Sequence, residues 1–119
     1  MIAPRRTSAN TTITISEKKL LDEIAQEWGL KPGVILRRLI LYLLQGKITV
    51  PEIMMKSNIQ EIDASEEKNF VPIRAALSQS EKDELLTMSK EWDFTVSTIL
   101  RRLIRALTSG VIQKEELWK

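Results

Sequence analysis

The chain contains neither cysteine nor histidine among its 119 residues. These absences exclude disulfides, thiolate nucleophiles and most zinc sites, and they remove the side chain most often used as a general base. The carboxylates are scattered along the chain, and we find no combination of nucleophile, base and orienting group. We therefore expect no enzymatic activity, no metal site and no cofactor.

Long hydrophobic runs are also absent. No apolar stretch approaches the roughly 18 residues that a membrane-spanning helix needs, and no basic segment followed by an apolar one opens the chain. We therefore expect a soluble, cytoplasmic protein without a membrane partner. The net charge is only +2 and the sequence pI is about 9.0, which together are a weak indication of an anionic partner.

What the sequence does contain is an internal repeat. The hexamer ILRRLI at residues 35–40 returns at residues 99–104, an offset of 64 positions. At this offset, without a gap, 15 of the 33 positions from Ser16 to Ile48 are identical to their counterparts. The chain is therefore a duplicated unit of about 40 residues. Each unit alone is too short to bury a sufficient core, so the two copies must stabilise each other or the chain must form oligomers.

The first copy has the pattern of one strand followed by two helices. Residues 10–15 are rich in β-branched side chains and alternate with a period of two, which predicts a strand with Ile13 and Ile15 facing inward. Ser16 is a suitable N-cap for a helix over residues 17–28, whose apolar stripe ends at the core residue Trp28. A second helix is predicted over residues 32–45, with Pro32 at its first position.

The second copy repeats this pattern. A strand is predicted over residues 71–78, and either Ser78 or Ser80 caps a helix over residues 81–92 that ends at a second core residue, Trp92. Thr95 is the expected cap of the last helix, which continues to about residue 109. We divide the chain into a basic N-terminal arm (1–9), repeat 1 (10–48), a linker (49–69) and repeat 2 (70–119). The arm has two interpretations, an unstructured tail or a segment that touches phosphates.

Three motifs in this order resemble the ribbon-helix-helix family of DNA-binding proteins, which includes the Arc, MetJ and CopG repressors. They are TITISE at residues 12–17, WGLKP at residues 28–32 and the repeated hexamer ILRRLI. The resemblance implies a mainly α fold with a short two-stranded antiparallel β-ribbon, in which one chain supplies both (β-α-α) halves as a tandem pseudo-dimer. It also implies sequence-specific binding of double-stranded DNA through the ribbon in the major groove, a role as a transcriptional repressor, and a cytoplasmic or nucleoid-associated location.

The same resemblance implies which side chains touch DNA. Outward residues of the two strands would contact bases: Asn10, Thr12, Thr14, Arg74, Ala76 and Ser78. Chemistry supports part of this set, because asparagine pairs with adenine and arginine with guanine through two hydrogen bonds each. Phosphates would be held by the basic arm and by the N-terminus of the second helix of each repeat. The residues concerned are Arg5, Arg6, Lys31, Gly33, Thr95, Ser97 and Thr98.

The two copies differ most in their second helix. Residues 34–44 are apolar almost all round, whereas the second copy has Arg105 and Thr108 in place of Leu41 and Leu44. A helix that is apolar all round is buried on more than one side. The helix over residues 32–45 therefore either carries residues 48–55 or lies at an interface between chains, so a homo-oligomer through this helix or through the linker is a further expectation.

Other functions are compatible with the same fold. Plasmid partition, assistance to a relaxase and antitoxin activity would all retain the ribbon. A helical protein-interaction module is an alternative of a different class, in which the strands only hold the two copies together. Such a module would have no salt-dependent affinity for DNA.

Overall fold

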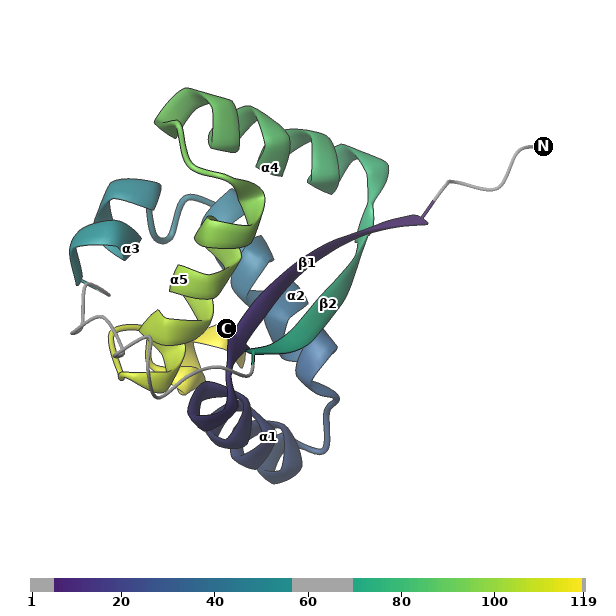
Figure 1. Ribbon diagram of the computed structural model, residues 1–119, viewed down its shortest axis with the longest axis vertical. Helices are drawn as coiled ribbons and strands as arrows, with labels where there is room; N and C mark the ends of the chain where they lie inside the picture. Colours follow the sequence, from purple (N-terminus) through teal and green to yellow (C-terminus); the bar gives the residue numbers. More distant parts are fainter. Residues whose placement is uncertain (1–5, 57–69, 119) are drawn as a thin grey trace.

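The computed structural model describes residues 6–56 and 70–118 (Figure 1). Its described part is mainly helical, with one two-stranded antiparallel sheet, as the sequence predicts. The elements in chain order are β1 (Arg6–Thr14), α1 (Ile15–Trp28), α2 (Pro32–Leu44), α3 (Val50–Lys56), β2 (Phe70–Ser78), α4 (Gln79–Trp92), α5 (Val96–Thr108) and the 3-10 helix η1 (Lys114–Trp118). Among the described residues, none of the helices is both long and apolar enough to cross a bilayer.

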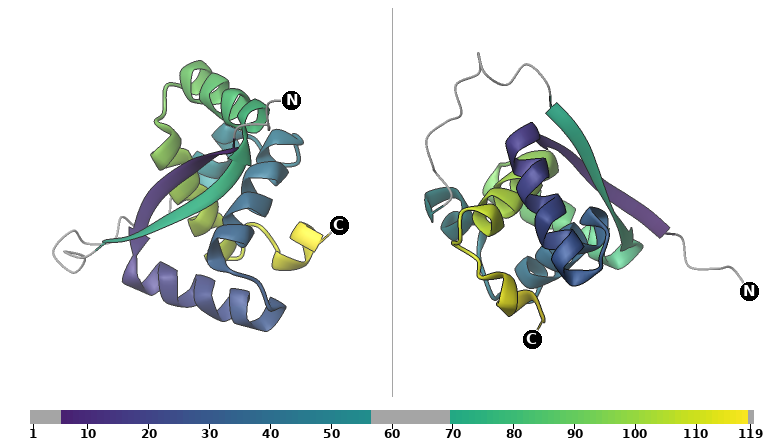
Figure 2. Two further views of the ribbon diagram at one scale, coloured as in Figure 1. Left: turned by 90° about the vertical axis from the view of Figure 1, so that its right-hand side faces the viewer. Right: turned by 90° about the horizontal axis from the view of Figure 1, so that it is seen from below.

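Strands β1 and β2 form a ribbon that lies along one side of the molecule, with the helices behind it (Figure 2, right). Their register is continuous from Arg6 opposite Ser78 to Thr14 opposite Phe70. Residues of alternate position are buried, as the period of two requires, and these are Ala9, Thr11, Ile13, Ile73, Ala75 and Leu77. Strand β1 begins at Arg6 rather than at residue 10, so part of the predicted arm belongs to the ribbon.

Both strands pass directly into helices through capping boxes. The Thr14 side chain accepts a hydrogen bond from the Glu17 backbone N–H, and the Glu17 carboxylate accepts one from the Thr14 N–H. Ser78 and Glu81 do the same for α4, which decides between the two caps left open by the sequence. The prediction of Ser16 as a cap was wrong, because α1 begins at Ile15, directly after the cap Thr14, and Ser16 is already its second residue. Ile15 consequently opens α1 and is 55% exposed instead of facing inward.

The repeated hexamer forms the centre of the core. Helices α2 and α5 pack against each other, and each also packs against the strand of the other copy, α2 against β2 and α5 against β1. The four apolar side chains of each hexamer are 0% exposed, namely Ile35, Leu36, Leu39, Ile40, Ile99, Leu100, Leu103 and Ile104. The hexamer is therefore identical in both copies at the positions where the two repeats meet. The two copies therefore share one core, which is one of the two arrangements that the length of the repeat predicts.

The structural repeat extends beyond residue 48. Helix α3 packs on α5 and α4, and the C-terminal η1 packs on α2. At the same offset of 64, Ile53 of α3 corresponds to Leu117 of η1, and both side chains are buried. Residues 50–56, placed in the linker by the sequence, form a helix that packs on α5 and α4 and not on α2, so one of the two alternatives for the apolar face of α2 was wrong. The C-terminal turn packs on α2 instead, and the other alternative, an interface between chains, stays a prediction. The rest of the predicted linker, residues 57–69, lies outside the described residues.

The two tryptophans that end the first helix of each repeat differ in burial. Trp28 is partly buried and packs against the core. Trp92 is 42% exposed, so its assignment to the core was wrong. Helix α4 also buries fewer side chains than α1: Leu85 is the only buried residue among the described side chains of α4, whereas α1 buries Glu17, Leu21 and Ala25.

Candidate nucleic-acid interface

The outer face of the ribbon presents six side chains in three cross-strand pairs: Ser8 with Ala76, Asn10 with Arg74, and Thr12 with Pro72. None of the six is acidic, and the central pair is exposed on both strands. Asn10 and Arg74 are also related by the sequence repeat, since they are 64 positions apart. The centre of the strand register and the centre of the repeat therefore coincide at this pair.

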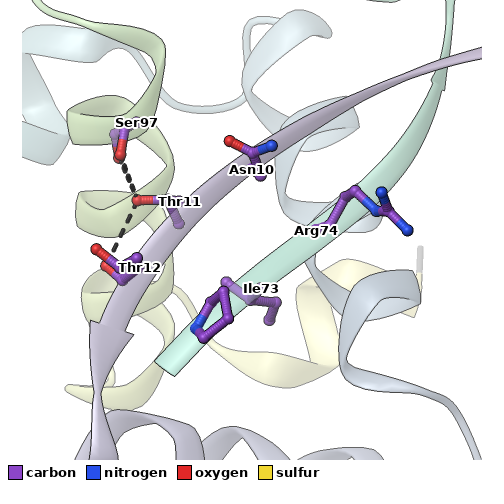
Figure 3. Close-up of a pocket in the computed structure, with 7 residues that line it drawn as sticks. Asn10, Thr11, Thr12, Ile73, Arg74 and Ser97 are labelled. Carbon is purple, nitrogen blue, oxygen red and sulfur yellow. Dashed lines mark hydrogen bonds between the residues drawn. The ribbon is translucent and has the colours of Figure 1, made fainter. Parts of the chain in front are cut away.

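A hollow of about 460 Å³ opens on this face. Its lining includes Asn10 and Arg74 together with residues on both sides of the ribbon: Thr11, Thr12, Pro72, Ile73 and Ser97. Figure 3 shows Asn10 and Arg74 on adjacent strands, with Thr11 turned toward Ser97 of α5. The Thr11 Oγ1 lies 2.7 Å from the Ser97 carbonyl oxygen, to which it donates, and 2.8 Å from the Ser97 Oγ. This contact fixes β1 to the N-terminal turn of α5.

Thr12 is held in place by an arginine from the hexamer. Arg101 donates from Nε to the Thr12 carbonyl oxygen at 2.9 Å and from Nη2 to the Thr12 Oγ1 at 3.2 Å. The same guanidinium lies 5.5 Å from the centre of the Phe70 ring, within the range of a cation–π interaction. Because the Thr12 Oγ1 accepts from Arg101, its own hydrogen is left to donate outward. No pattern in the sequence indicates this role, since Arg101 is identical in type to its counterpart Arg37.

The outermost predicted base-contacting residues lie at the helix caps. Thr14 is 2% exposed and its hydroxyl is bonded to the Glu17 N–H, so it does not belong to the outer face. Ser78 is exposed, and its hydroxyl lies 3.2 Å from both the Glu81 N–H nitrogen and the Ser80 Oγ. Asn10, Thr12, Arg74 and Ala76 do face outward. Ser8 and Pro72 complete this face. Ser8 was missed because the predicted first strand began at residue 10, and Pro72 was missed because a proline side chain cannot donate a hydrogen bond to a base.

The residues predicted to hold phosphates have different environments. Lys31 is exposed at the start of α2, and Gly33 packs against the Arg74 carbonyl oxygen. The Thr95 hydroxyl caps α5 by accepting from the Thr98 N–H at 3.1 Å, and it also lies 2.8 Å from the Thr98 Oγ1. Ser97 is bonded to Thr11, as described above. Of the basic arm, Arg5 lies outside the described residues, and only the backbone of Arg6 is described, as the first residue of β1.

One further basic residue lies beside the ribbon. The Lys82 Nζ donates to the Ser8 carbonyl oxygen at 2.9 Å, which places its charge next to the outer face. The acidic residues of the two capping boxes are neutralised by arginines of the second helices. Arg105 lies 3.5 Å from Glu17, and Arg37 lies 3.3 Å from Glu81. Arg74 on the outer face and Lys82 beside it are therefore two basic residues near the centre and one edge of the ribbon.

Comparisons of the chain with protein-family models, with curated proteins and with solved structures find no match.

Proposed function

We propose that the chain binds double-stranded DNA in a sequence-specific manner, with the outer face of the β1–β2 ribbon in the major groove. The major groove admits a two-stranded ribbon, and its base edges present a distinct pattern of donors and acceptors for each base pair. The observation that carries the proposal is the exposed cross-strand pair Asn10–Arg74. Asparagine is suited to the N6 and N7 of adenine, and arginine to the O6 and N7 of guanine.

The proposal includes a tandem ribbon-helix-helix arrangement. The order of strand, helix and helix occurs twice, and the strands of the two copies pair within one chain. These features favour a fused pseudo-dimer that needs no second chain to complete its ribbon. A protein of this kind would occupy DNA without a cofactor and without covalent chemistry. Its simplest regulatory role is repression, by excluding other proteins from the site.

Phosphate contacts would orient the ribbon without reading the sequence. Lys31 at the start of α2 and Lys82 beside β1 carry the charges for this role. The positive end of the α2 dipole adds to the attraction of Lys31 for a phosphate. Binding of this kind depends steeply on salt, because each neutralised phosphate releases counterions.

The test is selection of bound sequences from randomised duplex DNA at two salt concentrations. The wild-type chain should enrich a short motif. Arg74→Ala should lose roughly 1–3 kcal/mol of discrimination at one base pair, whereas Lys31→Ala should weaken binding to all sequences and reduce the salt slope by about one. Lys90→Ala, which removes the same charge from the end of α4, is the matched control and should leave binding unchanged.

Two results would count against the proposal. Equal weakening of all sequences by Arg74→Ala would reduce Arg74 to a phosphate contact. An absence of any salt-sensitive affinity for DNA would remove the proposal and favour the helical protein-interaction module.

A further inference from the structure

The ribbon has an approximate two-fold axis, and the strand register locates it. Residues related by the repeat are 64 positions apart, and across the ribbon Asn10 faces Arg74, its own counterpart. The neighbouring pairs obey the same relation, because Ser8 faces Ala76, the counterpart of Thr12, and Thr12 faces Pro72, the counterpart of Ser8. In an antiparallel ladder, the axis that relates the two strands passes midway between a residue and the counterpart that faces it. The axis therefore passes between Asn10 and Arg74.

At this axis the backbones are equivalent but the side chains are chemically different. Asn10 offers one acceptor and one donor group, and Arg74 offers donors only. Facing residues of an antiparallel pair have Cα atoms about 4.5–5.5 Å apart, so the two side chains extend to neighbouring base pairs on the two sides of the centre of a bound site. A site with adenine under Asn10 and guanine under Arg74 would satisfy both.

From this geometry we infer that the Asn10–Arg74 pair fixes the direction in which the protein lies on DNA. This inference rests on the proposed function. Turning the protein by 180° about the axis would exchange the two side chains and keep nearly all backbone contacts. Arg74 would then face the amino group of adenine, donor against donor. Asn10 would face guanine, whose N7 and O6 are both acceptors, so the side-chain oxygen of Asn10 would meet an acceptor. The two directions differ in affinity because of this mismatch and not because of the phosphate contacts.

The flanking residues also differ chemically on the two sides of the axis. On one side of the axis, Arg101 holds Thr12 with its hydroxyl free to donate beside Pro72. On the other side, the counterpart Arg37 is bonded to both carboxylate oxygens of Glu81 at 3.3 Å. The two halves of the outer face therefore differ in donors as well as at the centre.

The first experiment exchanges the central side chains. Asn10 and Arg74 are both exposed, so the variants Asn10→Arg, Arg74→Asn and the double exchange should retain the fold, which circular dichroism checks. In selection from randomised duplex DNA, the wild type should enrich an asymmetric centre. Asn10→Arg should enrich G·C on both sides of the axis, and Arg74→Asn should enrich A·T on both sides. The double exchange should reverse the central bases while the flanking bases stay, and inverting the centre should cost the wild type about tenfold or more in affinity.

The second experiment reads the direction itself. Because the chain has no cysteine, a single one carries a DNA-cleaving iron chelate at a unique position. Ser16→Cys and Ser80→Cys are matched counterparts, both exposed, at the starts of α1 and α4, which lie at opposite ends of the ribbon (Figure 1). On the enriched site, each labelled protein should cleave one end only, and the two labels should cleave opposite ends.

The outcomes separate this inference from the function on which it rests. If the wild type enriches a motif but each label cleaves both ends equally, or if the exchanges leave the central bases unchanged, the direction is not set by this pair although the protein reads DNA. If no variant and no wild-type protein enriches a motif, the proposed function fails and the inference fails with it.

Discussion

Helix α2 approaches strand β2 closely at Gly33, and the replacement of this glycine by alanine is the sharpest test of how the helix packs on the ribbon. A Cβ at residue 33 would lie 2.5 Å from the Arg74 carbonyl oxygen and 3.7 Å from its carbonyl carbon. The nearest atom belongs to the backbone of β2, so no side chain can rotate away. To restore an ordinary contact, α2 and β2 would have to separate by roughly 1 Å.

Two opposing terms set the size of the effect. Overpacking of this kind costs about 1–3 kcal/mol, and alanine is favoured over glycine in a helix by about 0.5–1 kcal/mol. The extremes of the two ranges give a net loss of about 0–2.5 kcal/mol in the free energy of unfolding. At about 4 °C for each kcal/mol in a domain of this size, the midpoint of thermal unfolding should fall by up to about 10 °C.

The assay is thermal unfolding followed by circular dichroism, together with amide NMR shifts along β2. The matched control is Ser97→Ala, because residue 97 is the repeat counterpart of Gly33 and already accommodates a side chain. This control loses the contact between the Ser97 and Thr11 hydroxyls, but the Thr11 Oγ1 still donates to the Ser97 carbonyl oxygen, so β2 should not move. A Gly33→Ala protein that melts at or above the wild-type temperature, with unchanged shifts at Arg74, would refute the close approach of α2 to β2.

Three further predictions concern the caps, the third helix and the single tyrosine. In denaturant unfolding, Glu17→Gln should lower the free energy of unfolding by about 1–3 kcal/mol, because the ion pair of Glu17 with Arg105 is almost fully buried. Glu81→Gln should lower it by less than about 1 kcal/mol, because the ion pair of Glu81 with Arg37 is more exposed, and equal losses would contradict this difference in burial. Ile53→Ala should cost about 2–5 kcal/mol because the side chain is 0% exposed, and a loss near zero would show that α3 is not part of the core. The hydrogen bond to the Glu116 carboxylate, followed by burial, raises the pKa of Tyr42 from 10.0 to about 12, so ultraviolet titration should show tyrosinate forming near pH 12 and Glu116→Gln should return it toward pH 10. The folded state holds this proton more tightly than the unfolded state, so the associated stability is complete below pH 10 and is lost as the pH rises through 12; an unshifted titration would exclude the contact.

Much of the framework was predictable because it depends on local periodicity. The alternation of residues in the two strands, the proline that starts α2 and the exact repetition of the hexamer each reflect a local preference or a buried position. The hexamer was the strongest signal, since its four apolar side chains face the other copy and its two arginines have to tolerate a partly buried surface. These features do not depend on knowing which segments meet in space.

The boundaries and the third element were less accessible. Thr14 and Ser16 are both good capping residues, and the choice between them depends on whether Ile15 continues the strand. The spacing of Thr14 and Glu17 matches a capping box and was the available signal. Helix α3 and η1 share few identical residues, and their relation is visible only once both pack against the second helix of the opposite repeat. A short apolar segment carries no information about which surface it covers.

The candidate site also depends on an asymmetry that identical residues conceal. Arg37 and Arg101 occupy the same position of the hexamer, yet Arg37 pairs with Glu81 and Arg101 pairs with Thr12. The reason lies one helical turn away, where Arg105 stands at the counterpart of a leucine and pairs with Glu17, the counterpart of Glu81. With that carboxylate neutralised by Arg105, Arg101 is available to hold the ribbon. The single difference between Leu41 and Arg105 therefore separates the roles of two identical arginines. Arg37 forms an ion pair with Glu81 of α4, whereas Arg101 positions Thr12 on the candidate DNA-reading face.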